Sequence, residues 1–539
     1  SPSSTSTAKP CRLGARDSST THTHRSSYCT PSWAMSVSWP APSTCAAGGA
    51  LLAAAAWLLF FRLLPSVVAR TRTRRLPMEE AAGKARLPPG SFGWPVVGET
   101  LDFVSCAYSP RPEAFVDRRR LRYGSAVFRS HLFGSATVVT ADAEVSRCVL
   151  QSDARSFVPW YPRSLTELMG KSSILLLNGS LQRRVHGLVG AFFKSPQLKA
   201  QVTADMQRRL APALAAWRDQ GPGARLRIQD HAKTMVFQIL VRGLIGLEAG
   251  PEMQQLKQQF QEFIVGLMSL PIKLPGTRLY RSLQAKKRMA RIIQRIIQDK
   301  RRNRGTLDDD AGGEGPPPPR DAIDVLMGDG SDDGLTDELI SDNMIDLMIP
   351  AEDSVPVLIT LAVKFLSECP LALQQLEEEN MQLKMRKTDV GETLEWTDYM
   401  SLSFTQHVIT ETLRLGNIIS GIMRKAVRDV EVKGHLIPKG WCVFVYFRSV
   451  HLDDTLYEDP CKFNPWRWKE KDMSTSSFTP FGGGQRLCPG LDLARLEASI
   501  FLHHLVTSFR WVAEEDHIVN FPTVRLKGGM PIRVTARED

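Results

Sequence analysis

The sequence predicts a mainly α-helical protein with a small β portion, built as a single large domain behind an N-terminal apolar segment. Its 539 residues would allow about three domains at roughly 100–200 residues each, or one large domain with appendages. The 43% hydrophobic and 23% charged fractions are those of a globular protein. Helical apolar spacing dominates the second half, where strand-like pieces such as Trp441–Phe447 are short. These observations favour one helical domain.

The charge and the cysteines limit the classes of function. Lys and Arg exceed Asp and Glu by 68 − 57 = 11, which would suit nucleic acid, an anionic membrane surface or an acidic protein partner. Since no zinc-finger spacing or nucleic-acid-binding motif occurs, we expect no nucleic-acid partner. The nine cysteines are odd in number, widely spaced and free of CxxC pairs. They argue against a disulfide framework and for a reducing compartment.

The first segments carry no globular pattern. Residues 1–44 are rich in Ser, Thr, Ala and Pro, and we expect a disordered or artefactual N-terminal extension, with Met35 as an alternative initiator. Residues 45–69 form an apolar run that reaches the ~20 residues of a transmembrane anchor if Arg62 extends to the interface. The arginines that follow, from Arg70 to Arg75, place that side in the cytosol. A cleaved signal peptide is the alternative.

The remaining chain divides into a connector and a domain. Residues 70–97 are basic and proline-rich, and prolines fix φ and remove N–H donors, so we expect a stiff connector. Residues 98–539 have a globular pattern and form the predicted domain. Within it, residues 303–320 are of low complexity and contain four consecutive prolines, which predicts a surface loop between two helical blocks.

The most informative stretch is Phe478–Gly490, which reads FTPFGGGQRLCPG. Its three glycines let the backbone approach a large planar ligand without Cβ collisions. Cys488 follows, and Pro489 suits the first position of the helix expected next. A helix N-terminus, together with Arg486 two residues away, would favour the thiolate of Cys488, a good axial ligand for haem iron. For an isolated cysteine, a buried structural role would be the simpler interpretation.

The arrangement Phe481-x-x-Gly484-x-Arg486-x-Cys488-x-Gly490 resembles the cysteine-loop signature of the cytochrome P450 superfamily at every fixed position. The resemblance implies the cytochrome P450 fold, a haem b (iron protoporphyrin IX) whose iron is bound by Cys488, and O₂ as co-substrate. Contacts with the haem are implied for one further set of residues: Phe481, Gly482, Arg486, Arg424 and His186.

Two further motifs occur upstream of the cysteine loop. Glu411-x-x-Arg414 lies in a helix-like run, where residues i and i+3 share a face. Arg467, within Phe463–Trp468, resembles the family's second-arginine motif. The resemblance implies a structural network of Glu411, Arg414 and Arg467. A buried carboxylate shared by two guanidinium groups is costly unless its hydrogen bonds are complete.

A long helix from about Thr336 to Leu366 is predicted, with Thr336 as its N-cap. Pro350 and Pro356 should kink it and free the carbonyls of Asp346 and Glu352 to hold water. The kink resembles the family's oxygen-activating helix, with Asp353 at the acid position and Ser354 replacing the usual threonine. The implied catalytic role of this acid–alcohol pair is proton delivery. The alternative is an N-capping Asp-Ser at a helix break.

The chain departs from the family early in the domain. The family often has Trp-x-x-x-Arg, whose arginine binds a haem propionate, and the matching positions here hold Gln182 and His186. By the resemblance, Arg424 and Arg486 match family propionate-binding positions better, and rigid positive donors suit carboxylates. Either arginine could instead be an ordinary surface residue.

The resemblance extends from about Leu87 to Arg537 and is closest to the plant brassinosteroid-biosynthetic branch, in particular the steroid C-23 hydroxylases. It implies hydroxylation of the side chain of a 22-hydroxylated sterol, with electrons from NADPH delivered by NADPH–cytochrome P450 reductase. It also implies an endoplasmic reticulum membrane location with the catalytic domain in the cytosol. The apolar segment 262–276 would touch the membrane, or else be ordinary core helix and loop.

Three other functions fit parts of the pattern. One is oxygenation of another plant sterol or triterpenoid. Another is a haem-thiolate isomerase or dehydratase, which would need neither O₂ nor the Asp353-Ser354 pair. The third is a non-enzymatic haem-binding or membrane scaffold protein.

Overall fold

The computed structural model describes residues 85–538, apart from 96, 153, 311–318, 329–333, 471–476 and 522. All of these residues belong to the unit Glu80–Asp539. The predicted extension 1–44, the predicted anchor 45–69 and most of the connector 70–97 lie outside the described residues.

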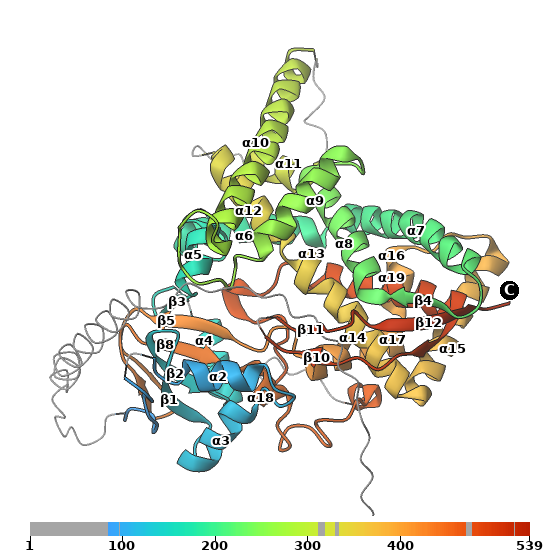
Figure 1. The fold of residues 1–539 in the computed structure, drawn as a ribbon. Helices are drawn as coiled ribbons and strands as arrows, with labels where there is room; N and C mark the ends of the chain where they lie inside the picture. Colours follow the sequence, from blue (N-terminus) through green and yellow to red (C-terminus); the bar gives the residue numbers. More distant parts are fainter. Residues whose placement is uncertain are drawn as a thin grey trace, which may run out of the picture. The chain divides into compact units, whose positions relative to one another are not determined.

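Helices make up most of the described chain (Figure 1). The α-helices are α2 Thr100–Ala107, α3 Ala114–Tyr123, α4 Ala143–Gln151, α5 Arg163–Met169, α6 Gly179–Lys194, α7 Pro196–Asp219, α8 Ile228–Ile245, α9 Pro251–Ile264, α10 Arg278–Asp310, α11 Ala322–Met327, α12 Asp337–Met348, α13 Pro350–Asp353, α14 Val355–Glu368, α15 Pro370–Val390, α16 Trp396–Ser401, α17 Ser403–Gly416, α18 Phe447–His451 and α19 Leu491–Ser508. Two 3₁₀ turns, η1 Pro465–Trp468 and η2 Gly484–Arg486, lie between α18 and α19.

The strands form small sheets, as the sequence predicts. The largest has five strands in the order β1-β2-β8-β5-β3 and lies beside α2 and α4 (Figure 1). A three-stranded sheet has the order β4-β12-β9, and β10-β11 and β6-β7 form pairs. The strands are β1 Val127–Leu132, β2 Ser135–Thr140, β3 Phe157–Pro159, β4 Ala224–Arg227, β5 Ile422–Ala426, β6 Val430–Val432, β7 His435–Ile437, β8 Cys442–Val445, β9 Phe509–Ala513, β10 Ile518–Val519, β11 Arg525–Leu526 and β12 Pro531–Ala536.

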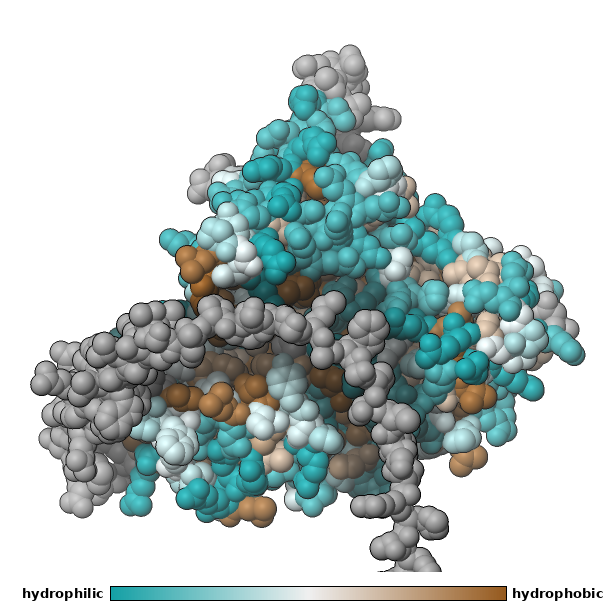
Figure 2. Space-filling view, viewed as in Figure 1, coloured by the Kyte–Doolittle hydropathy of each residue, from teal (hydrophilic) through white to brown (hydrophobic). Residues whose placement is uncertain are grey.

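The main core lies among the helices, and α14 and α19 run through it. Most side chains of both helices are buried. A helix that is apolar on nearly all sides is stable only inside such a core, because burial stabilises by roughly 25 cal/mol per Å² of apolar surface. The long helix α10 differs, since its sequence is strongly polar, and hydrophilic residues cover it in the space-filling view (Figure 2).

The predicted long helix around Pro350 is broken into α12, α13 and α14. The Thr336 hydroxyl accepts a hydrogen bond from Leu339 N at 3.3 Å, which confirms the predicted N-cap. The break falls at Ser354, whose φ of −122° and ψ of −74° are not helical. One detail of the prediction is wrong: the Asp346 carbonyl is not free, because it accepts from Ile349 N at 3.2 Å. A tightened last turn therefore satisfies it.

Two further observations concern predicted segments. Helix α10 continues to Asp310, so the first part of the predicted loop 303–320 is helical, and the prolines that exclude a helix begin only at Pro316.

Within the described residues, no single helix has the length and apolarity to cross a membrane. The bent pair Asp337–Glu368 and Pro370–Val390, with an angle of 116° between its two parts, meets that criterion only by length and composition.

Candidate active site around Cys488

The cysteine loop ends in the turn η2, and Cys488 lies between this turn and α19. The backbone N–H of Cys488 donates to Phe481 O at 3.0 Å, which closes the loop on itself. Helix α19 begins at Leu491 with Gly490 as its N-cap, so Cys488 lies close to a helix N-terminus, as predicted. Pro489 precedes the N-cap and does not occupy the first helical position that the sequence suggests.

The electrostatic prediction for Cys488 is wrong in one respect. Burial raises the pKa of the Cys488 thiol, and the N–H of Gly490 only partly opposes this rise. Arg486 does not supply the expected cation, because its guanidinium donates to the carbonyls of Ile174 and Leu175 at 3.3 and 3.5 Å. Burial therefore favours the neutral thiol, and a metal ion bound at the sulfur would favour the thiolate.

Two glycines of the loop, Gly484 and Gly482, are needed for different structural reasons. Gly484 has φ +65°, and a Cβ there would lie 2.3 Å from the carbonyl oxygen of Leu150 in α4. The loop backbone thus packs directly against another helix at this point, which the sequence does not reveal. Gly482 has φ +76°, and a Cβ there would meet only Arg486 O, at 3.9 Å. Its open side fits the predicted approach of a large ligand. The Phe481 side chain packs, half-buried, against the main core.

Arg424, which is buried, and Arg486, which is half-buried, form a cationic corner. Arg424, on β5, is 8% exposed and donates to Met423 O at 3.2 Å. Burial lowers the pKa of Arg424, and burial together with the charge of Arg424 lowers the pKa of Arg486 to about 10. Within the described part of the chain, neither guanidinium forms an ion pair with a carboxylate. Both arginines line one small pocket, with Leu150, Ser152, Ala154, Phe157, Asn178, Gln182 and Gln485.

This corner tests whether the site fits a haem group. Two neighbouring guanidinium groups withdrawn from solvent without an anion are costly, and the cost is relieved when a ligand brings carboxylates. The corner is connected to the cysteine loop, since Arg486 is two residues from Cys488. A half-buried soft sulfur beside a cationic corner is a donor set that suits an iron porphyrin with two carboxylates. The residues present fit the group.

Gln182 and His186 both lie on α6 and both contact the cysteine loop. Gln182 Nε2 donates to Gln485 O at 3.2 Å, and His186 Nε2 is 2.8 Å from Leu487 O. The partner of His186 is thus a backbone carbonyl. Its contact with a haem propionate stays a prediction.

Asp353 and Ser354 lie together at the break between α13 and α14. Burial raises the pKa of the Asp353 carboxyl, while Lys233 and the hydroxyl of Thr523 oppose the rise. The neighbouring Glu352 forms an ion pair with Lys233 of α8. The break thus presents a carboxyl of raised pKa next to a hydroxyl, which is an arrangement that can hold and pass a proton. N-capping is not its role, because Ser354 makes no side-chain cap at the start of α14.

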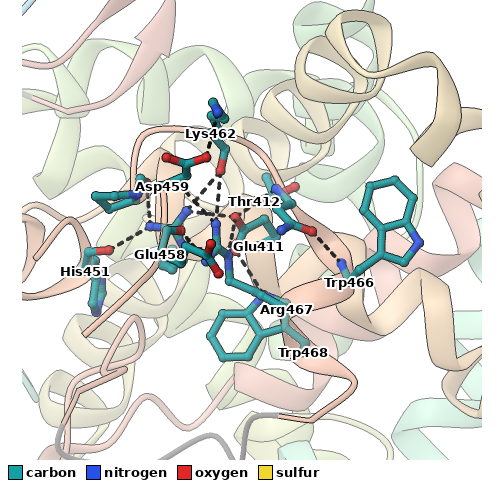
Figure 3. A network of polar contacts seen from close by, with 12 residues as sticks. Glu411, Thr412, His451, Glu458, Asp459, Lys462, Trp466, Arg467 and Trp468 are labelled. Carbon is teal, nitrogen blue, oxygen red and sulfur yellow. Dashed lines mark hydrogen bonds and ion pairs between the residues drawn. The ribbon is translucent and has the colours of Figure 1, made fainter. Parts of the chain in front are cut away.

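The network of Glu411, Arg414 and Arg467 forms (Figure 3), and its two i,i+3 members are completely buried. Arg414 donates to Glu411 from Nε at 2.9 Å and from Nη2 at 2.7 Å. Arg467 Nε donates to Glu411 Oε1 at 3.0 Å. The carboxylate also accepts from Asn464 N and from Trp468 Nε1, each at 3.0 Å. Five donors complete the hydrogen bonds of one buried carboxylate, which meets the condition for such a group to be tolerated.

His451 connects this network to the cysteine loop, and the sequence pattern does not identify it. Its carbonyl accepts from Arg414 Nη1 at 2.7 Å. Its ring Nε2 accepts from Thr479 N at 3.1 Å, so Nδ1 carries the hydrogen and donates to Asn417 Oδ1 at 2.7 Å. Burial and the charge of Arg414 lower the pKa of His451 to about 3, so the ring stays neutral near pH 7. The sequence pattern also does not identify Trp468 as a donor to Glu411, since the second-arginine motif fixes no indole position.

A mainly helical domain that presents a half-buried cysteine on a glycine-rich loop, braced by a Glu-Arg-Arg network, has the features of the haem-thiolate proteins. The family model "Cytochrome P450" matches residues 88–530, and the chain belongs to this family.

Two relatives and one solved structure are also similar to this chain. The chain is 85% identical over 458 residues to "Cytochrome P450 90D2" of Oryza sativa subsp. japonica, covering 85% of this chain and 91% of the relative. It is 60% identical over 448 residues to "3-epi-6-deoxocathasterone 23-monooxygenase CYP90D1" of Arabidopsis thaliana, covering 83% and 89%. The structure of "Retinoic acid bound cyanobacterial CYP120A1" matches with a TM-score of 0.71 at 23% identity, covering 84% of this chain and all of that one. The last match supports the predicted fold.

Proposed function

We propose that this chain is a haem-thiolate monooxygenase that hydroxylates C-23 of a 22-hydroxylated brassinosteroid precursor. The observation that carries the proposal is the 60% identity, over 448 residues, to a protein named as a 3-epi-6-deoxocathasterone 23-monooxygenase. Cys488, the cationic corner and the acid–alcohol break supply the residues that such a reaction needs.

The haem b group would be held by residues from four elements of the chain. Cys488 Sγ would bind the iron, Arg424 and Arg486 would bind the carboxylates, and Gly482 and Phe481 would contact the group. His186 Nε2 already donates to Leu487 O, so contact of His186 with a carboxylate would require a second N–H, at Nδ1. When bound, haem supplies the activation of O₂ with electrons that come from NADPH through NADPH–cytochrome P450 reductase.

The chain's own part in the chemistry is to orient the sterol, exclude water and move protons. Ser354 offers a hydroxyl at the break, and Asp353 behind it offers a carboxyl of raised pKa. A carboxyl whose pKa is closer to neutrality exchanges protons more readily at pH 7 than an exposed one does. Lys233, paired with Glu352, keeps a positive charge next to the pair.

A membrane location follows from two apolar segments. The first is the predicted anchor 45–69, followed by arginines that favour a cytosolic domain. The second is an exposed apolar patch after α9, formed by Val265, Met268, Leu270, Ile272 and Leu274, which are 42–74% exposed. A patch of this kind suits contact with lipid, from which a sterol would enter. We propose the endoplasmic reticulum membrane.

Product analysis tests the proposal. The full chain is reconstituted with NADPH, the reductase and a panel of 22-hydroxylated sterols with 3-oxo or 3-hydroxy groups. The expected product carries one additional hydroxyl at C-23. Asp353→Asn and Ser354→Ala should lower turnover about 10²- to 10⁴-fold while leaving sterol binding unchanged. Hydroxylation elsewhere on the sterol, or no oxygenation, contradicts the proposal.

A further inference from the structure

One face of α6 follows the cysteine loop over four successive contacts. Gln182 and His186, one turn apart, reach the carbonyls of Gln485 and Leu487. Further along the same helix, a Cβ at Gly190 would lie 4.0 Å from the Pro489 side chain, and a Cβ at Gly490 would lie 3.8 Å from the Phe193 ring. Helix and loop therefore run alongside each other in the same chain direction. Residues four apart share one helical face, so a single helix can hold the loop from 485 to 490.

The loop is held from its other side through Arg486. The two carbonyls that α6 binds belong to the residues before and after Arg486. The Arg486 side chain donates to the carbonyls of Ile174, Leu175 and Leu177 and to Asn178 Oδ1. The backbone between 485 and 487 is thus fixed between α6 and the segment 174–178. The sulfur position of Cys488 then depends on both sets of hydrogen bonds.

The His186 contact also acts on the peptide group of Cys488. A carbonyl can only accept, so Nε2 of His186 carries a hydrogen and donates to Leu487 O. The Leu487 carbonyl and the Cys488 N–H are parts of one peptide unit, and this N–H donates to Phe481 O. A donor on the carbonyl polarises that unit and strengthens the second hydrogen bond. It also offsets the negative end of a dipole beside the sulfur.

We propose that Gln182 and His186 are positioning residues that hold the cysteine loop by its carbonyls, in place of the tryptophan and arginine that the family often has at these positions. The inference rests on the proposed ligation of haem iron by Cys488. It assigns these two side chains to the protein loop and requires neither of them to contact a haem carboxylate.

The test uses the haem-loaded full chain and His186→Ala, Gln182→Ala and the double variant. Two readouts are followed: the rate at which the carbon monoxide complex loses its thiolate-type Soret shift, and the ferric–ferrous reduction potential. Each single variant should lose the thiolate signature about tenfold faster, as is common when a partner of a metal ligand is removed. His186→Ala should shift the potential to a more negative value, because the carbonyl dipole beside the sulfur is no longer offset.

Two further variants separate a specific effect from a general one. Arg183→Ala, an exposed position between the two residues on the same helix, should behave as the unmodified chain does. His186→Gln should restore both readouts, because Gln182 demonstrates that a glutamine on α6 reaches a loop carbonyl.

Three outcomes would contradict the positioning role of Gln182 and His186 or the proposed ligation by Cys488. Unchanged decay and potential in both alanine variants overturn the inference. Rescue by His186→Arg but not by His186→Gln also overturns it, in favour of a direct contact between residue 186 and a haem carboxylate. If the unmodified chain gives no thiolate-type shift, or if Cys488→Ala keeps it, the proposed ligation itself fails, and this result is distinct from the other two.

Discussion

The Glu411 network and the Arg424–Arg486 corner are both largely withdrawn from solvent, and they differ in how completely the protein balances their charge. Glu411 receives five donors from its own chain, two of them from Arg414. In the corner, the charge of Arg424 lowers the pKa of Arg486, the oxygens that accept from the two guanidinium groups are neutral, and among the described residues no carboxylate pairs with either. The difference indicates which cluster is complete in the folded chain and which one is built for a ligand.

The same contrast separates the roles of the two clusters. Removing one partner from a satisfied buried network leaves a charge without compensation, so the cost appears in folding. Removing a cation from an unsatisfied corner relieves repulsion in the empty protein, so the cost appears only in ligand binding. Four changes test this separation.

The largest effect is expected at Cys488, the centre of the ligand-built region. Cys488→Ala should abolish the thiolate-type carbon monoxide spectrum and all turnover. The fold should persist, because α19 and the main core do not depend on the sulfur. Circular dichroism and the carbon monoxide difference spectrum, measured on the same sample, check both statements. Cys461→Ala, which changes an exposed cysteine, is the matched control. A retained thiolate spectrum would exclude Cys488 as the ligand.

Breaking the satisfied network should cost stability before anything else. Glu411→Ala leaves two guanidinium groups buried without their carboxylate and should lower the free energy of unfolding by about 3–5 kcal/mol. Urea unfolding of the haem-free and haem-bound chain measures the loss, which should be present in both. Glu515→Ala removes a carboxylate whose side chain is 88% exposed and should change stability by less than about 0.5 kcal/mol. Equal losses in the two variants would contradict the network's role.

A substitution in the Arg424–Arg486 corner should weaken haem binding without lowering the stability of the haem-free chain. Arg424→Met replaces a buried cation with an apolar side chain of similar length, so the haem-free chain should be as stable as the unmodified one or more stable. Haem affinity should fall about 10- to 100-fold, the usual range when a supporting contact to a bound metal group is lost. Haem titration and thermal unfolding of the haem-free chain provide the two measurements. If this substitution destabilises the haem-free chain by several kcal/mol, the corner is structural.

A second buried glutamate extends the comparison to a carboxyl without such donors. Glu497 of α19 is 3% exposed, and its Oε2 has no hydrogen-bond partner among the described residues. Burial raises the pKa of Glu497 from 4.5 to about 8. The folded chain therefore holds a proton that the unfolded chain releases, and stability falls as the pH rises through this range.

Glu497→Gln should remove this fall in stability with rising pH. Between pH 7 and pH 8 the unmodified chain should lose about 1 kcal/mol relative to the variant, since one pH unit corresponds to ~1.4 kcal/mol for a fully released proton. Urea unfolding at both pH values measures the difference. Well below pH 4.5 the Glu497 carboxyl is protonated in both the folded and the unfolded chain, so the variant and the unmodified chain should have the same pH dependence of stability there. A variant with the same slope as the unmodified chain would show that Glu497 is already ionised in the folded state.

Short-range patterns determined much of the site. The fixed positions of the cysteine loop span ten residues, and Glu411 and Arg414 are one helical turn apart, so linear spacing carries them. Thr336 as an N-cap and the break near Ser354 follow from local backbone chemistry, because a hydroxyl caps a helix and prolines remove N–H donors.

Contacts between distant segments were decided only by the tertiary structure. Gln182 and Gln485, or His186 and Leu487, are about 300 positions apart, and no local pattern relates them. The same holds for Arg486, which the sequence assigns to the thiolate and the fold directs to the carbonyls of segment 174–178. Burial is also a tertiary quantity, and it is burial that raises the pKa of the Cys488 thiol. The sequence by itself determined which residue can bind iron, and packing determined how that residue is held.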